Sequence, residues 1–212
     1  MKKSILILFA IVGMASFCKA QDSENDFREK IQFGVKAGVN YANVYDSQGE
    51  KFSADGKFGF AGGGFLSIPI SKFLGIQPEI LFSQKGFQAT GSLLGYDYKY
   101  THTGNYLDIP IMFSLKPSEY ISIVAGPQYS YLLSSKNEFT SSLYSYLQEQ
   151  EMKNDNIRKN TFCFIGGVDI TMKNIVISAR AGWDFFNNNG DGTSTTPRYK
   201  NAWYQATIGY RF

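Results

Sequence analysis

The C-terminal stretch WYQATIGYRF, residues 203–212, gives the strongest indication of the fold. Its apolar residues recur with a period of two, so one face of an extended strand would be apolar and the other polar. The apolar face suits lipid, and the polar face suits water or a polar interior. A soluble chain rarely ends in mid-strand on an exposed Phe212, whereas a transmembrane barrel must end on a strand that pairs with its first strand.

The N-terminus predicts export. Lys2 and Lys3 form a basic start, residues 5–17 are apolar, and Ala20 supplies the small residue that signal peptidase requires. We therefore expect residues 1–20 to be a cleaved signal peptide. The apolar run is too short for a membrane helix, which needs roughly 20 apolar residues, so we expect any insertion into a membrane to use strands.

The basic character of the chain belongs to this export signal. Removal of Lys2, Lys3 and Lys19 with the signal lowers the number of Lys and Arg residues from 21 to 18, which equals the 18 Asp and Glu residues. A neutral mature chain gives no reason to expect nucleic acid as a partner. Cys163 would be the only cysteine of the mature chain, so no intramolecular disulfide is expected.

Eight segments of the mature chain alternate in polarity and are predicted to be strands. They cover residues 31–41, 57–68, 74–85, 106–115, 121–133, 162–171, 175–185 and 203–212. Long connections at 45–56, 87–98, 135–160 and 187–198 alternate with short turns. An up-and-down barrel has this order, with short turns on the periplasmic side. We therefore predict an all-β fold, an eight-stranded antiparallel up-and-down transmembrane β-barrel over residues 31–212, after a short flexible periplasmic lead at 21–30.

The charged residues within these segments all fall on the face opposite the apolar one. A soluble sandwich would show the same alternation but would bury the apolar face in its own core. The terminal phenylalanine and the alternation of long and short connections favour the membrane barrel. A soluble periplasmic barrel that carries a ligand is the alternative.

The inward charges predict what fills the barrel. A barrel of eight strands has an interior only wide enough for side chains, so inward charges must pair with one another. Lys36, Glu79, Asp108 and Arg180 lie at similar depths, counted from the short turns. We predict a lumenal charge network that involves Glu79 and Arg180, with Lys36 and Asp108 nearby, and a plugged lumen rather than a pore.

Pro78, Pro110 and Pro127 lie inside predicted strands. Each removes a backbone donor that a closed barrel would otherwise use. We expect β-bulges at these positions. If the prolines end strands instead, the count of eight is wrong.

Several motifs along the chain resemble one family. They are FGVKAGVN at 33–40, IQPEILFSQKG at 76–86, YLDIPI at 106–111, AGP at 125–127 and GYRF at 209–212, and they are similar to the PorT-type outer-membrane β-barrel family of the Bacteroidota. The resemblance covers essentially the whole mature chain and implies location in the cell outer membrane and, for a few members, a part in protein secretion. Ile208, Tyr210 and Phe212 resemble the C-terminal insertion signal that the barrel-assembly machinery recognises.

No catalytic or cofactor-binding residues are predicted. The one histidine, His102, lies at the outer end of a predicted strand, where Asp184 and either Ser83 or Ser130 are the candidates for a catalytic set. No defined spacing links a base to a nucleophile, so a solvated histidine is the favoured interpretation. An outer-membrane enzyme that acts on lipid or peptide at the rim is the alternative.

No metal site is predicted either. Residues 187–192, NNNGDG, match part of a calcium loop, but Arg198 occupies the position of the bidentate Glu, so a plain turn is favoured. Cys163 falls on the inward face among small residues and is interpreted as inert packing.

The connection at 136–159 is the longest, and it carries apolar residues that a partner could bury. Phe139, Leu143, Tyr146 and Leu147 have roughly helical spacing, which favours a short surface helix and a contact surface for a protein partner. Loops held by a rigid scaffold commonly carry function. We therefore predict a non-enzymatic outer-membrane protein with a structural or interaction role through its extracellular loops, in contact with outer-membrane lipid.

Overall fold

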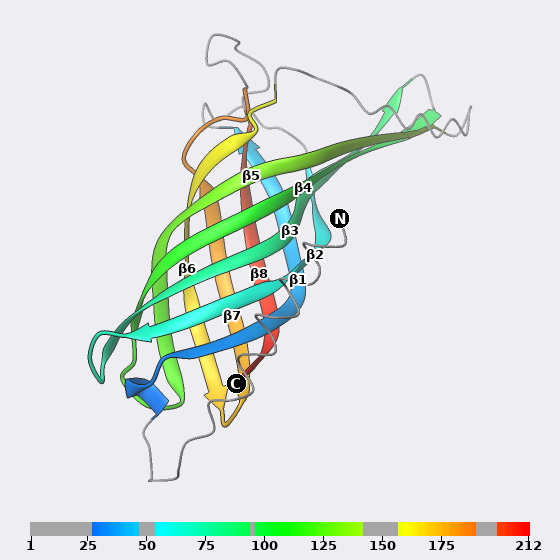
Figure 1. Cartoon of the computed structure of the whole chain (residues 1–212). Helices are drawn as coiled ribbons and strands as arrows, with labels where there is room; N and C mark the ends of the chain where they lie inside the picture. Colours follow the sequence, from blue (N-terminus) through cyan, green and yellow to red (C-terminus); the bar gives the residue numbers. More distant parts are fainter. Residues whose placement is uncertain (1–26, 47–53, 94–95, 142–156, 190–198) are drawn as a thin grey trace, which may run out of the picture.

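The structure, a computed structural model, describes residues 27–46, 54–93, 96–141, 157–189 and 199–212. Its strands form one closed antiparallel sheet (Figure 1), in which each strand pairs with its neighbours in sequence and β1 pairs with β8. The strands are β1 (Gln32–Asp46), β2 (Asp55–Pro69), β3 (Leu74–Leu93), β4 (Tyr96–Leu115), β5 (Ile121–Ser141), β6 (Asn160–Met172), β7 (Ile175–Asp184) and β8 (Tyr199–Arg211). The predicted eight-stranded up-and-down barrel is therefore confirmed.

A short 3-10 helix, η2 (Phe27–Glu29), precedes β1 and occupies part of the predicted lead. The predicted signal peptide, residues 1–20, lies outside the described residues. In the part of the chain that the structure describes, no helix is long and apolar enough to cross a membrane.

The apolar face of the strands points outward. Phe58, Phe113 and Tyr204 are 69%, 67% and 69% exposed, although they are among the largest apolar side chains of the sheet. The inward positions hold mostly polar, charged and small residues. A soluble protein would bury its apolar face, so this outward band excludes the soluble sandwich and matches a wall that contacts lipid.

The pairing of β1 with β8 closes the barrel. The backbone N–H of Phe212 donates to the carbonyl oxygen of Phe33 at 2.9 Å. The two rings stack with their centroids 5.1 Å apart, and Tyr210 meets Phe212 edge-on. The last residue thus completes the ladder that closes the ring, because an open sheet edge is not tolerated in lipid.

The strands β3, β4 and β5 are longer than predicted, with 20, 20 and 21 residues. The predicted loop at 87–98 is wrong in large part, since its residues on either side of 94–95 continue the β3–β4 hairpin. The predicted loop at 135–160 is wrong at its start, where residues 135–141 belong to β5. A strand that spans the membrane needs about 9–11 residues, so we infer that the distal halves of these strands project beyond it. Figure 1 shows β3, β4 and β5 extending to one side, away from the rest of the barrel.

A bulge in β5 shifts, by one residue, which of its side chains point inward in this projecting sheet. Asn105 pairs with Ser134 and Tyr106 pairs with Leu132, which leaves Leu133 as an extra residue. In β5, the residues that point inward therefore have even numbers up to Leu132 and odd numbers beyond the bulge.

Phe139 lies on the inner face of β5 and stacks on Tyr98 of β4, with ring centroids 5.9 Å apart. The expectation of a helix is therefore wrong at Phe139. Leu143, Tyr146 and Leu147 lie outside the described residues.

The in-strand prolines interrupt pairing without shifting the register. Pro78 pairs with Ile111, and the ladder resumes at Leu81 and Asp108 in the same register after two missing pairs. The shifts in register occur elsewhere, between Gly56 and Ala61 and at the β5 bulge. The prediction of bulges at the prolines is wrong, because the sheet leaves ladder pairs unformed around them instead.

Candidate functional site: the lumen and its turn-side mouth

Four charged side chains meet in the lower lumen, nearer the short turns. Arg180 on β7 donates to both carboxylate oxygens of Glu79 on β3, at 2.8 and 3.0 Å. Lys36 on β1 donates to Glu79 Oε1 at 2.7 Å. Because β3 and β7 are four strands apart in the ring, the Arg180–Glu79 pair joins opposite walls of the barrel.

Asp169 on β6 completes this lower cluster. Its carboxylate accepts from Arg180 at 3.1 Å and from the Gln77 amide at 2.9 Å, and the same amide nitrogen also reaches Glu79 at 3.0 Å. The two cations and two carboxylates balance, and none of the four is more than 4% exposed. Burial of such charges is tolerable only when each is paired and hydrogen-bonded, a condition that this geometry meets.

A second cluster lies further from the turns, around Lys85 on β3. Lys85 Nζ lies 3.0 Å from Asp108 Oδ1 and 3.3 Å from Ser130 Oγ, and the Ser130 hydroxyl donates to Asp108 at 2.6 Å. The same ammonium lies 3.9 Å from the centre of the Trp203 ring, on β8. This cation–π contact again joins distant strands across the lumen.

The second cluster continues to Asp184 on β7. Asp184 accepts from the Cys163 thiol at 3.0 Å and from the Asn201 side-chain amide at 2.6 Å. Cys163 is fully buried, in keeping with the interpretation as packing, although it also holds a polar contact that the sequence did not indicate.

The structure brings together three of the four residues predicted for the lumenal network. Lys36 and Arg180 both contact Glu79, whereas Asp108 binds Lys85 in the other cluster. Asp169 and Lys85 were missed as members, although both fall on the inward phase of their strands. Alternation shows which way a side chain points, but the height at which two side chains meet depends on strand register.

The residues considered for catalysis do not assemble. His102 Nδ1 lies 2.6 Å from Asn137 Oδ1, while Ser83 binds Asn40, Ser130 binds Asp108 and Asp184 binds Cys163. The interpretation of His102 as a solvated residue is wrong, because it is only 5% exposed and stacks on Phe87. His102 lies beyond the membrane-spanning part of β4, where burial lowers its pKa below the ordinary value.

The described residues contain no group of three or more His, Cys, Asp and Glu side chains that could hold a metal ion. The partial calcium-loop match at 187–192 extends into residues that lie outside the described ranges.

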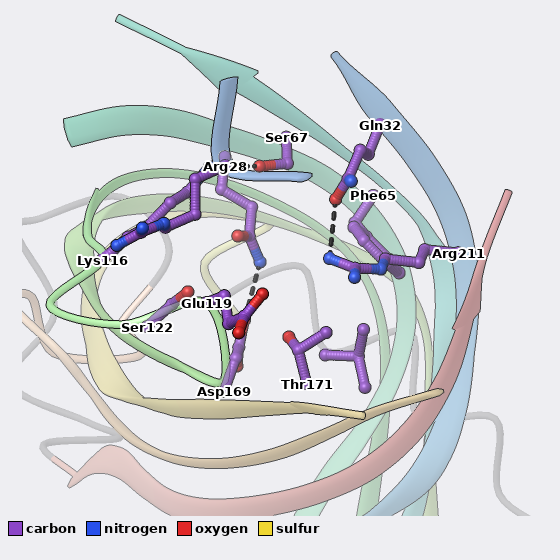
Figure 2. A pocket seen from close by; sticks show the side chains of 12 residues that line it. Arg28, Gln32, Phe65, Ser67, Lys116, Glu119, Ser122, Asp169, Thr171 and Arg211 are labelled. Atoms are coloured by element: carbon purple, nitrogen blue, oxygen red, sulfur yellow. Dashed lines mark hydrogen bonds between the residues drawn. The ribbon is translucent and has the colours of Figure 1, made fainter. Parts of the chain in front are cut away.

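A small cavity opens at the turn-side mouth of the barrel (Figure 2) and has a volume of about 30 Å³. Arg211 of β8 donates to the side-chain oxygen of Gln32 at 2.9 Å and, through Nε, to the carbonyl oxygen of Lys173 at 2.8 Å. The cavity is lined by Arg28, Gln32, Phe65, Ser67, Gln77, Lys116, Glu119, Ser122, Asp169, Thr171, Val176 and Arg211. Its inner wall includes Gln77 and Asp169, so it ends against the lower charge cluster.

Residues 19–189 match the family described as outer membrane protein beta-barrel domain. The chain belongs to this family. Its barrel lies in the lipid of the cell outer membrane, with the apolar wall against the lipid.

The chain is also similar to solved barrels, at low sequence identity. Ail, the attachment invasion locus protein of Yersinia pestis, in complex with the heparin analogue sucrose octasulfate, is 15% identical, with a TM-score of 0.46 and coverage of 86% of this chain and 99% of Ail. Neisserial surface protein A is 12% identical, with a TM-score of 0.45 and coverage of 87% and 100%. OprG of Pseudomonas aeruginosa is 12% identical, with a TM-score of 0.42 and coverage of 87% and 97%. No curated protein matches the chain significantly.

Proposed function

We propose that this protein is a non-enzymatic outer-membrane barrel of the PorT type, from the Bacteroidota, with a plugged lumen and a structural or interaction role. The observation that carries the plugged lumen is the contact of Arg180 with Glu79, at 2.8 Å, between strands on opposite walls. Side chains that meet across the diameter leave no continuous water path at that level. His102, Ser83 and Ser130 each hydrogen-bond to a different residue and not to one another, which supports a non-enzymatic role.

The route to the membrane belongs to the same proposal. Residues 1–20 direct export and are cleaved, and the barrel-assembly machinery recognises Ile208, Tyr210 and Phe212. All three side chains are exposed on the outer wall, at 62%, 49% and 61%, where an insertion factor can reach them before the barrel enters lipid. The contact between Phe212 and Phe33 gives the last residue a second role in closing the barrel.

The interaction role is assigned to the connection at 136–159 and to the strand end that supports it. β5 carries Phe139 well beyond the membrane-spanning segment, and the side chain is 48% exposed even though it stacks on Tyr98. An exposed aromatic residue on a rigid projecting sheet offers a partner apolar area at low entropic cost.

A photo-crosslinking experiment in living cells tests this role. A photoreactive phenylalanine analogue replaces Phe139, and in a matched control it replaces Phe113, which lies on the lipid-facing wall and is 67% exposed. We expect a discrete protein adduct only from position 139, and loss of that adduct when residues 142–156 are deleted. The deletion leaves every described strand intact, so heat-modifiable gel migration should persist. The absence of any adduct at 139 in a folded barrel would contradict the interaction role.

A further inference from the structure

A groove lies on the outer wall of the barrel, where β8, β1 and β2 pair side by side. Its volume is about 580 Å³. Lys36 borders it only through its backbone, since the Lys36 side chain points into the lumen and binds Glu79. The outward residues that line the groove are apolar or aromatic, namely Val35, Ala37, Phe60, Gly62, Ile175, Ile208 and Tyr210.

Small residues on adjacent strands create this hollow in the wall. Ala37 on β1 pairs with Gly62 on β2 and with Ile208 on β8. The Phe60 ring leans over Gly62, because a Cβ atom at Gly62 would lie 2.8 Å from a carbon of that ring. Ala37 and Gly62 therefore form a floor between two large side chains, Phe60 on one strand and Ile208 on another.

The surroundings and the size of the groove select a hydrocarbon chain as its occupant. The outer wall of the barrel contacts the lipid of the outer membrane, so the groove is continuous with that interface. A group the size of a water molecule or a methylene takes up about 30 Å³ in a liquid. The groove thus has room for roughly 20 such groups, which corresponds to one acyl chain of a membrane lipid.

The turn-side end of the groove lies beside a cation. Ile175, the first residue of β7, pairs with Tyr210 of β8, and both line the groove. Lys173, in the turn directly before β7, is exposed, and its carbonyl oxygen accepts from Arg211 Nε at 2.8 Å. This bond holds the turn against the strand that carries Tyr210. A lysine at the end of a membrane-spanning strand reaches the level of the lipid headgroups, where it attracts phosphate.

We propose that this groove is a binding site for one glycerophospholipid of the turn-side leaflet. One acyl chain lies over Ala37 and Gly62, and the phosphate group lies at Lys173. The site covers the wall next to the pairing of β1 with β8, where the barrel closes. It does not depend on the contact role proposed for residues 136–159.

Native mass spectrometry of the purified, folded protein released from detergent micelles tests the proposal. The probe is dimyristoylphosphatidylglycerol, titrated into the micelles, and the control ligand is dimyristoylglycerol, which has the same acyl chains but no phosphate. We expect a saturable adduct of one phospholipid per barrel. Dimyristoylglycerol should bind several-fold more weakly, because it lacks the group that contacts Lys173.

Two matched variants locate the acyl chain. Ala37→Phe fills the groove and should raise the dissociation constant of the phospholipid about tenfold or more. Ala125→Phe makes the same change on the outward face of β5, outside the groove lining, and should leave the dissociation constant unchanged. Heat-modifiable gel migration confirms that both variants are folded. Should Ala37→Phe fail to fold, the smaller Ala37→Leu replaces it with the same direction of change.

A third variant tests the headgroup contact. Lys173→Gln should bring the affinity for the phospholipid close to that for dimyristoylglycerol. The proposal is overturned if no saturable adduct of one phospholipid forms, if Ala37→Phe and Ala125→Phe bind it equally, or if the phospholipid binds no better than dimyristoylglycerol. A dimer mass that Ala37→Phe abolishes would also overturn it, because the groove would then hold a second copy of the chain.

Discussion

Substitution of Glu79 by alanine is the sharpest perturbation of the lumen. Glu79 accepts two hydrogen bonds from Arg180, one from Lys36 and one from Gln77, and it is 2% exposed. Removal of one partner from a buried pair costs about 3–5 kcal/mol, because it leaves a buried charge uncompensated. Arg180 keeps its contact with Asp169, so we expect a loss near the lower end, about 3 kcal/mol of unfolding free energy.

Urea unfolding of the protein in phospholipid vesicles, followed by tryptophan fluorescence, measures this loss. The matched control is Glu138→Ala, because Glu138 also pairs with a lysine, Lys136, at 2.9 Å, but both side chains are 40% or more exposed. An exposed pair contributes about 0–1 kcal/mol, so the control should unfold near the midpoint of the unaltered protein.

A double substitution separates the loss of charge balance from the loss of packing. Glu79→Ala with Lys36→Met removes one carboxylate and one cation, which leaves the cluster balanced between Arg180 and Asp169. We expect the double variant to recover about 1 kcal/mol or more relative to Glu79→Ala alone. Equal stability losses for Glu79→Ala and Glu138→Ala would refute the reasoning that the lower cluster is a buried, interdependent network.

Three further changes address other parts of the barrel. Deletion of Phe212 removes the stack on Phe33 and should lower the heat-modifiable fraction in membranes several-fold, as measured by gel migration. Burial lowers the pKa of His102, so the unfolded chain binds its proton more readily. Stability should therefore fall as pH drops through about 6.5 towards the folded-state pKa, and His102→Gln should flatten this pH dependence of urea unfolding. Gly38→Val places a side chain against the β8 backbone and should prevent a folded barrel, whereas Gly64→Val, whose nearest atom is 3.6 Å away, should fold normally by the same gel assay.

The number, order and facing of the strands could be predicted because the membrane enforces them. Lipid requires an unbroken apolar outer face, and a small barrel requires polar or small residues inside. The residue type at positions such as Phe113 and Asp108 therefore indicates whether the side chain points outward or inward. The alternation of long and short connections then fixed the topology. Each of these signals acts within one strand or between neighbours.

The strand lengths could not be predicted, because alternation weakens where the sheet leaves the membrane. Beyond that level the outer face of β3, β4 and β5 meets water instead of lipid, so the apolar alternation weakens and residues 87–98 were interpreted as a loop. The extra residue at Leu133 also shifted the phase of β5, which made the position of Phe139 unpredictable from spacing alone.

The partners of the lumenal charges depend on register and on contacts across the ring. Sequence showed that Lys36, Lys85, Glu79 and Asp108 point inward, but pairing a lysine with a carboxylate requires their heights in a tilted barrel. The turn-side cavity is lined in part by Lys116, a residue outside any predicted strand. The alternation within a strand does not indicate where the side chain of a residue outside the strand points.

The central claim is that side chains from opposite walls plug the lumen of this barrel. Conductance in planar lipid bilayers tests this claim most directly. Because Arg180 meets Glu79 across the ring and Lys85 meets Trp203 at a second level, the purified protein should insert without producing a stable conductance. Steady channels of porin size from the intact, heat-modifiable protein would contradict the plugged lumen.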